Sequence, residues 1–285
     1  MRRYDQAKEL AGQAIAADPQ LIDCYQVMAR ACLGLNQLDL AEEHLRTALT
    51  FDPSDRWTLR VLGLVLRLKG KISEATAMAQ ECLRVDPDYD EAHLEYGNCL
   101  RAAKKYKEAQ QAFERAVALS PESVRALESL GDFYLSRKFY PAAEKVYRRA
   151  LAVKPNTASI LNNLGICLEN QDKLKEAALA YKSALVLDPT MQAAKENTER
   201  SVENILGGGA LGLTVMIFVG AKTIQIIGRT YGRNALVIAI CVALIILLCV
   251  GVWFYNRFLR KKAEEQLSEA DPQLLEIYDR LKKFG

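Results

Sequence analysis

Six prolines stand 34 residues apart along the first two thirds of the chain. Proline makes up about 5% of an average sequence, so six in a single phase indicate an internal repeat. Because proline ends a helix and begins the turn that follows, the period also predicts where each repeat finishes. The six are Pro19, Pro53, Pro87, Pro121, Pro155 and Pro189.

Small and large residues keep the same phase as the prolines. Alanine recurs 12 residues before each proline, and alanine or cysteine recurs five before it. Small side chains let two helices approach closely, and large apolar ones fill the remaining space. Each repeat is therefore predicted to be a pair of helices. Glycine stands 24 residues before four of the prolines, at Gly63, Gly97, Gly131 and Gly165, and large residues stand eight before, at Leu45, Phe113, Tyr147 and Tyr181.

This pattern resembles the tetratricopeptide repeat (TPR) over residues 1 to about 191. The resemblance implies an all-α fold, a right-handed α-solenoid of TPR helix hairpins, each with a helix A and a helix B. In the register of the family, 22–191 forms five units: 22–55, 56–89, 90–123, 124–157 and 158–191.

The two ends of the array depart from complete repeats. Residues 1–21 align with a helix B alone, a half repeat; the chain is shortened there, or another molecule covers the helix, or the helix is a cap. Residues 192–206 have one apolar and one charged face, as expected of a capping helix.

Residues 207–255 are predicted to be a membrane region. The run 235–255 has 21 residues without a charge, about 31 Å of helix, which matches the hydrocarbon thickness of a bilayer. The run 207–228 is also apolar but contains Lys222 and Gln225. Either it spans too, which makes a transmembrane hairpin, or it lies flat on the interface.

Topology favours the hairpin. No apolar signal stands near the N-terminus to export the repeats, and the tail after the second run is basic. Two spans place the repeats and the basic tail on the same side of the membrane. We therefore expect an integral membrane protein, in a bacterial inner membrane, with its TPR domain in the cytosol.

The tail 256–285 is expected to be a cytosolic amphipathic segment. Its apolar face could dock on the repeats, lie on the membrane or bind a partner. A basic cluster precedes that face and is expected to lie at the membrane surface: Arg257, Arg260, Lys261 and Lys262.

Composition excludes some functions. Residues 1–204 carry 28 Lys and Arg and 29 Asp and Glu, so a nucleic-acid partner is not expected. The seven cysteines contain no CxxC pair and are expected to be free thiols. We find no catalytic constellation, metal cluster or cofactor motif, and expect neither an enzyme nor a metal or cofactor.

The family resemblance points to a binding groove. In related proteins, helix A side chains at positions 2, 5, 9 and 12 hold a protein or peptide, and a solvated inner face is the alternative. The known clamp for chaperone tails is absent, and an acidic segment meeting Arg30, Arg60 and Arg67 is the better expectation. The candidate groove residues are Gln26, Arg30, Trp57, Arg60, Leu64, Arg67, Leu94, Asn98, Arg101, Glu128, Asp132, Asn162 and Asn163.

Two functions fit these observations. In the first, the chain is a membrane-anchored interaction scaffold or adaptor whose groove recruits a cytosolic protein. In the second, it is an integral subunit or assembly factor of a membrane complex of the secretion, pilus or motor type. There, small-residue stripes such as Gly208 and Gly212 pack against another membrane protein. The lipid bilayer is a partner in both, and a second copy of the chain is a further possible partner.

Overall fold

The structure is a computed structural model that describes residues 2–207 and the helical positions Gly251, Phe254, Tyr255, Arg257, Phe258, Lys261 and Glu265. Over 2–207 the regular elements are twelve α-helices, with no strand. The all-α repeat fold predicted from the sequence is therefore confirmed for this part of the chain. Most of the predicted membrane region and tail lies outside the described residues.

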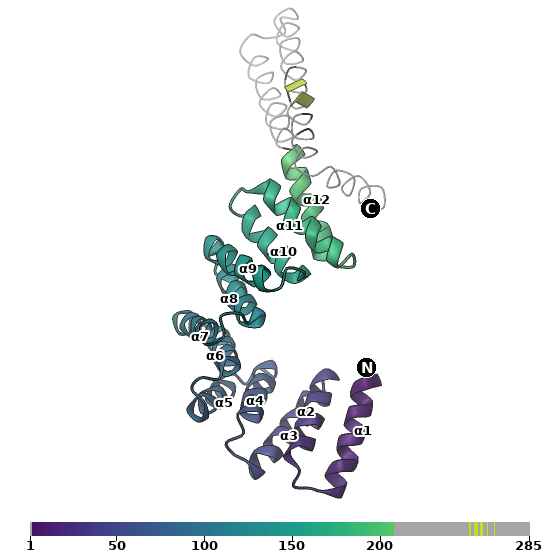
Figure 1. Ribbon diagram of the computed structural model, residues 1–285, viewed down its shortest axis with the longest axis vertical. Helices are drawn as coiled ribbons and strands as arrows, with labels where there is room; N and C mark the ends of the chain where they lie inside the picture. Colours follow the sequence, from purple (N-terminus) through teal and green to yellow (C-terminus); the bar gives the residue numbers. More distant parts are fainter. Residues whose placement is uncertain are drawn as a thin grey trace, which may run out of the picture. The chain divides into compact units, whose positions relative to one another are not determined.

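The chain divides into two compact units, each described here by itself. The first, Met1–Arg137, stacks α1 to α8 so that each helix lies beside the next (Figure 1). Helices α2, α4, α6 and α8 are the A helices, and α1, α3, α5 and α7 are the B helices. Their bounds are α1 Arg2–Ala17, α2 Ile22–Gly34, α3 Leu38–Phe51, α4 Arg56–Leu68, α5 Ile72–Val85, α6 Asp90–Ala102, α7 Tyr106–Leu119 and α8 Val124–Ser136.

The second unit, Lys138–Gly285, contains the last four described helices of the array (Figure 1). Helix α10 packs between α9 and α11, and α12 packs on α11 where the helix A of a further repeat would lie. The bounds are α9 Tyr140–Val153, α10 Ala158–Glu169, α11 Leu174–Leu187 and α12 Gln192–Gly207.

Turns within and between repeats explain the helix ends. Between repeats, Asp52 Oδ1 accepts hydrogen bonds from the backbone N–H and hydroxyl of Ser54, and Asp188 Oδ1 does the same with Thr190. These aspartates are turn residues, as their place directly before Pro53 and Pro189 predicts. Within repeats, the residue that reverses the chain has positive φ at each 34-residue step: Asn36, Gly70, Lys104, Lys138 and Asp172.

Close contact between the two helices of a repeat depends on the phased glycines. A Cβ placed on Gly97 would lie 2.9 Å from the Phe113 ring, and one on Gly165 would lie 2.4 Å from the Tyr181 ring. Both rings are fully buried. The sequence prediction that glycine lets helix A touch a large residue of helix B is correct at both places.

Buried carboxylates join a B helix to the turn between helix A and helix B of the following repeat. Glu42 on α3 accepts hydrogen bonds from Arg46, Lys69 and Lys71, and the bond from Lys69 contributes most to lowering the pKa of Glu42 to about 2. Glu144 on α9 stands 102 residues later and is held in the same way by Arg148, Gln171 and Lys173. Burial alone would raise the pKa of Glu144, but these donors lower it.

Among the described residues, none of the helices has both the length and the apolar character needed to cross a bilayer. The segments 207–228 and 235–255 lie outside those residues apart from Gly207, Gly251, Phe254 and Tyr255.

Replacing Gly165 by Ala is predicted to lower stability by about 1–3 kcal/mol, since the added methyl group must displace a fully buried tyrosine ring. The matched control is Gly12→Ala in α1, where the new Cβ would meet Met28 Cε at an ordinary 3.6 Å. That change should be neutral or stabilise by up to about 1 kcal/mol through helix propensity. Urea unfolding followed by circular dichroism measures both; equal midpoints for the two variants would contradict the packing argument.

Candidate partner-binding face

The candidate site is the set of side chains at positions 2, 5, 9 and 12 of the A helices, which we call the helix A face. In the first unit it is carried by α2, α4, α6 and α8, and in the second by α10, with α12 in the place of the next helix A. The contacts made by these side chains show which of them remain available to a partner.

Gln26, at position 5 of α2, contacts the start of the next helix A. Asp55 caps α4 by accepting the Thr58 N–H at 2.7 Å. Gln26 Nε2 donates to Asp55 Oδ2 at 2.8 Å and to Thr58 Oγ1 at 3.2 Å. The side-chain amide nitrogen of Gln26 therefore already donates its hydrogen bonds within the protein.

Arg60, at position 5 of α4, is held by the next repeat. Its Nη2 lies 3.0 Å from Glu91 Oε2 on α6, and its Nε donates to the Tyr89 hydroxyl at 3.1 Å. Only 9% of the Arg60 side chain is exposed. Glu91 also pairs with Arg125 on α8 at 3.2 Å, so one carboxylate links three successive A helices.

Arg67, at position 12 of α4, forms a second buried pair. Its Nε donates to Glu95 Oε1 at 2.6 Å, and the Glu95 side chain is 5% exposed. Burial opposes the charge on Arg67, but Glu95 outweighs it and raises the arginine pKa. Cys99 lies beside Glu95, where burial raises the pKa of its thiol to about 12. This thiol is therefore a packing group rather than a nucleophile.

Arg30 and Arg101 differ from these two arginines. The guanidinium of Arg30 lies over the Trp57 ring, 5.1 Å from its centroid, and Arg101 Nη2 donates to Asn98 Oδ1 at 3.1 Å. Within the described chain neither has a carboxylate partner. Ser129 stands one repeat after Glu95, which explains why Arg101 lacks the ion pair that Arg67 makes.

The remaining candidates in the first unit are apolar or half-buried. Trp57 and Leu64 are half-buried, whereas Leu94 is 3% exposed and belongs to the core. Glu128 and Asp132 on α8 are half-buried. Trp57, which lies against Arg30, and Leu64 on the same helix as Trp57 therefore provide the partly exposed apolar surface of the face.

In the second unit the polar candidates contact α12 or one another. Asn162 Oδ1 accepts from Asn197 on α12 at 3.0 Å, and Asn162 Nδ2 donates to Asn163 Oδ1 at 3.4 Å. Glu169 pairs with Arg200 at 3.0 Å and accepts the Tyr181 hydroxyl at 2.8 Å. Burial would raise the pKa of Glu169, but these donors lower it. The charge of Glu169 is therefore already neutralised within the second unit.

The sequence identified the positions of the helix A face but did not anticipate this pairing. A signal was present, because opposite charges stand 28 or 31 residues apart at Arg67 and Glu95, Arg60 and Glu91, and Glu169 and Arg200. These intervals join positions 5 and 12 of one unit to positions 2, 6 or 9 of the next. The expected contact of an acidic segment with Arg60 and Arg67 would have to compete with ion pairs that the fold already makes.

The predicted membrane-surface residues are only partly described. Arg257 and Lys261 are helical and exposed. Arg260 and Lys262 lie outside the described residues.

Comparison with sequence families decides the classification. Two profiles of the tetratricopeptide repeat match the chain, one over 1–60 and the other over 60–124, 100–151 and 129–191. The chain belongs to the tetratricopeptide repeat family. The TPR register used above is thus supported over more than half of the sequence. A search of curated protein sequences finds no match.

Solved TPR structures resemble the chain in fold. PilF of Pseudomonas aeruginosa is 19% identical and has a TM-score of 0.55, with 99% of both chains covered. PilW, a widely conserved type IV pilus biogenesis factor, is 20% identical with a TM-score of 0.61, covering 68% of this chain and 90% of its own. The APC/C hetero-tetramer Cut9–Hcn1 is 17% identical with a TM-score of 0.63, and the match covers 70% of this chain and 40% of that one.

Replacing Glu95 by Leu is predicted to lower the stability of the TPR array by about 2–4 kcal/mol, because the Arg67 guanidinium loses its buried partner. The double variant Arg67→Leu, Glu95→Leu should recover most of this loss, since two apolar side chains replace the pair. Urea unfolding of the full chain in detergent measures both. No recovery in the double variant would mean that Glu95 stabilises the fold by some other contact.

Proposed function

We propose that this protein is a membrane-anchored TPR scaffold that binds an acidic segment of a protein partner on the helix A face of its first unit. Family membership supports a binding role, since TPR arrays present extended surfaces formed by their A helices. The observation that carries the proposal is that Arg30 and Arg101 have neutral partners only, among the residues described.

The energetic reason for choosing these two arginines is the state of the others. A carboxylate that binds Arg60 or Arg67 must displace Glu91 or Glu95 and leave a buried charge unpaired. At Arg30 and Arg101 it displaces an aromatic face or a side-chain amide, neither of which carries a charge. A charged ligand is therefore accepted there at lower cost.

The spacing of the two arginines suggests the shape of the ligand. Arg30 is on α2 and Arg101 on α6, with α4 between them in the order of A helices. At 8–10 Å between packed helices, they are separated by roughly 20 Å. An extended chain covers that distance in about six residues. We expect a segment with two acidic side chains at that interval, and an apolar residue for Trp57 and Leu64.

The proposed anchor is the segment 207–255, with the TPR domain on the cytosolic side. Its two long apolar runs support this, and so do the described aromatic residues around its end. Phe254, Tyr255 and Phe258 are helical and 60–62% exposed. Large exposed apolar side chains grouped in this way are typical of contact with lipid or with another protein.

The groove proposal is tested with synthetic peptides carrying two aspartates at separations of two to ten residues. Fluorescence anisotropy with the full chain in detergent should show the tightest binding near a separation of six. The double variant Arg30→Gln, Arg101→Gln should weaken that binding about tenfold or more and reduce its salt dependence. A matched control is Lys107→Gln, which removes an exposed charge from α7 outside the face. Equal binding of all separations, or equal loss in the control, would contradict the proposal.

Anchoring is tested separately by alkaline carbonate extraction of membranes from expressing cells. The full chain should stay in the membrane pellet, and a variant that lacks 207–255 should be released, because the removed apolar runs are the proposed spans. Release of the full chain by carbonate would contradict the anchor without affecting the peptide measurement.

A further inference from the structure

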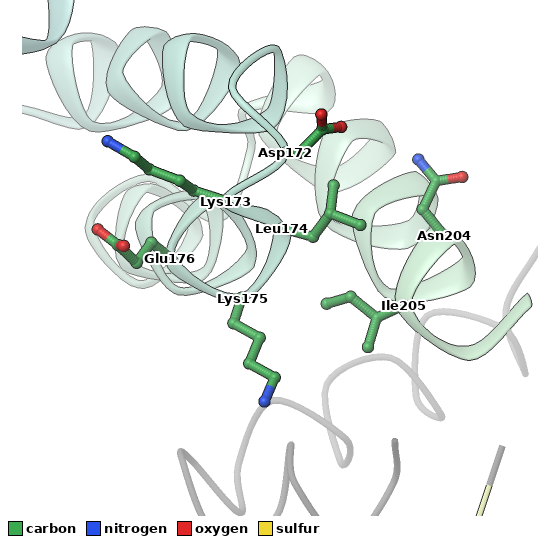
Figure 2. Close-up of a pocket in the computed structure, with 7 residues that line it drawn as sticks. All are labelled: Asp172, Lys173, Leu174, Lys175, Glu176, Asn204 and Ile205. Atoms are coloured by element: carbon green, nitrogen blue, oxygen red, sulfur yellow. The ribbon is translucent and has the colours of Figure 1, made fainter. Parts of the chain in front are cut away.

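A pocket of about 400 Å³ lies in the second unit between the first turn of α11 and the last turn of α12. Its lining combines apolar and charged groups from the two helices. Figure 2 shows Leu174 and Ile205 on facing sides, whereas the ends of Lys173 and Glu176 point away from α12. The residues are Asp172, Lys173, Leu174, Lys175, Glu176, Asn204 and Ile205. Nothing in the helix A face or its ion pairs uses this pocket.

The pocket stands at the point where the array meets the proposed anchor. Asn204 and Ile205 are two or three residues before Gly207, the first residue of the first apolar run. In a helix this interval is about 3–5 Å. The headgroup layer on each side of a bilayer is roughly 5–8 Å thick, from the difference between total and hydrocarbon thickness. If the anchor inserts, this end of the pocket lies within the headgroup layer.

The charges of the pocket are not equivalent. Lys173 pairs with Glu144 at 2.9 Å, and Glu176 pairs with Arg148 at 3.0 Å, so both are neutralised on the side of α9. Lys175 is exposed and makes no ion pair or hydrogen bond with any described residue. Figure 2 shows the side chains of Lys175 and Asp172 on opposite sides of Leu174, so the exposed aspartate does not neutralise Lys175 directly.

We propose that this pocket is a membrane-contact surface of the TPR domain, in which Lys175 binds the phosphates of phospholipid headgroups. Leu174 and Ile205 supply the apolar walls that suit the boundary between headgroup and acyl chain. A lysine with its stem along an apolar wall and its ammonium group at a phosphate is the usual arrangement at a membrane interface. The inference rests on the proposed anchoring and adds a second point of contact, on the repeats themselves.

This contact fixes the orientation of the second unit. With the Gly207 end of α12 and the first turn of α11 at the lipid, the opposite end of α12 points into the cytosol. Ala193 is exposed near that opposite end, 11 residues from Asn204, which is about 16 Å along the helix. Ala193 is therefore a reference position on α12, the helix that also contributes Asn204 and Ile205 to the pocket.

The test uses an environment-sensitive fluorophore on Lys175→Cys or Ala193→Cys in the full chain, reconstituted in phosphatidylcholine and phosphatidylglycerol vesicles. The buried Cys32, Cys82 and Cys99 have thiols whose pKa burial raises, so they react slowly. The other four cysteines, Cys24, Cys167, Cys241 and Cys249, are replaced by Ala. Lipids with a headgroup nitroxide should quench the probe at 175 at least threefold more than the probe at 193. Equal quenching at the two positions would overturn the proposal.

The role of the charge is tested with a reporter that leaves Lys175 in place. Asn170 is exposed at the end of α10, where the turn that leads into α11 begins. The variant Asn170→Cys carries the fluorophore at this position. Adding Lys175→Glu should lower the quenching of this reporter about twofold, because a carboxylate is repelled by lipid phosphate, whereas Lys175→Arg should preserve it. Unchanged quenching with Lys175→Glu would overturn the assignment of Lys175.

Flotation of the same vesicles separates this inference from the anchoring. A chain that fails to float contradicts the anchor, and this inference with it. A chain that floats, with the probe at 175 quenched no more than the probe at 193, contradicts this inference alone.

Discussion

The structure depends on how closely helix A and helix B of one repeat can approach. Where glycine faces an aromatic ring, as in Gly97 with Phe113 and Gly165 with Tyr181, there is no room for a methyl group. This contact requires the small and large residues to stay in step with the turn that joins the helices, which explains the strict 34-residue phase. Once the hairpin geometry is set, the contacts between repeats follow, such as those of α4 with α6 and of α6 with α8.

The fold could be predicted from the sequence because this constraint leaves a mark on every repeat. Proline, glycine and alanine are restricted by backbone shape and contact distance, which depend little on neighbouring repeats. The charged side chains of the helix A face are different. Whether Arg60 is available to a ligand depends on the residue 31 positions later, and Arg101 differs from Arg67 because Ser129 stands where an acid would be needed. The sequence predicts which positions form the face. Whether each charged side chain there is already paired depends on how adjacent repeats pack.

The helix A face thus has two roles that compete for the same side chains. Most of its charges stabilise the stacking of repeats, and buried pairs such as Arg67 with Glu95 also fix the register between them. Few charges are left for recognition, so selectivity would come from a small number of anchors on a rigid support. The proposed lipid contact at Lys175 would orient the second unit at the membrane.

The paired carboxylates on the B helices restrict how this array can change length during evolution. Glu42 is paired with Lys69 and Lys71 of the following repeat. Glu144 is held by Gln171 and Lys173, which stand 102 positions after Lys69 and Lys71. Excision of the unit 56–89 would place Ala103 and Lys105 opposite Glu42, which removes the hydrogen bond made by Lys69 and leaves Arg46 and Lys105 as the cations. Excision of three consecutive units would instead supply Gln171 and Lys173, which already donate hydrogen bonds to Glu144. The repeats look interchangeable by period, but the hydrogen bonds that each buried acid receives depend on which unit follows it.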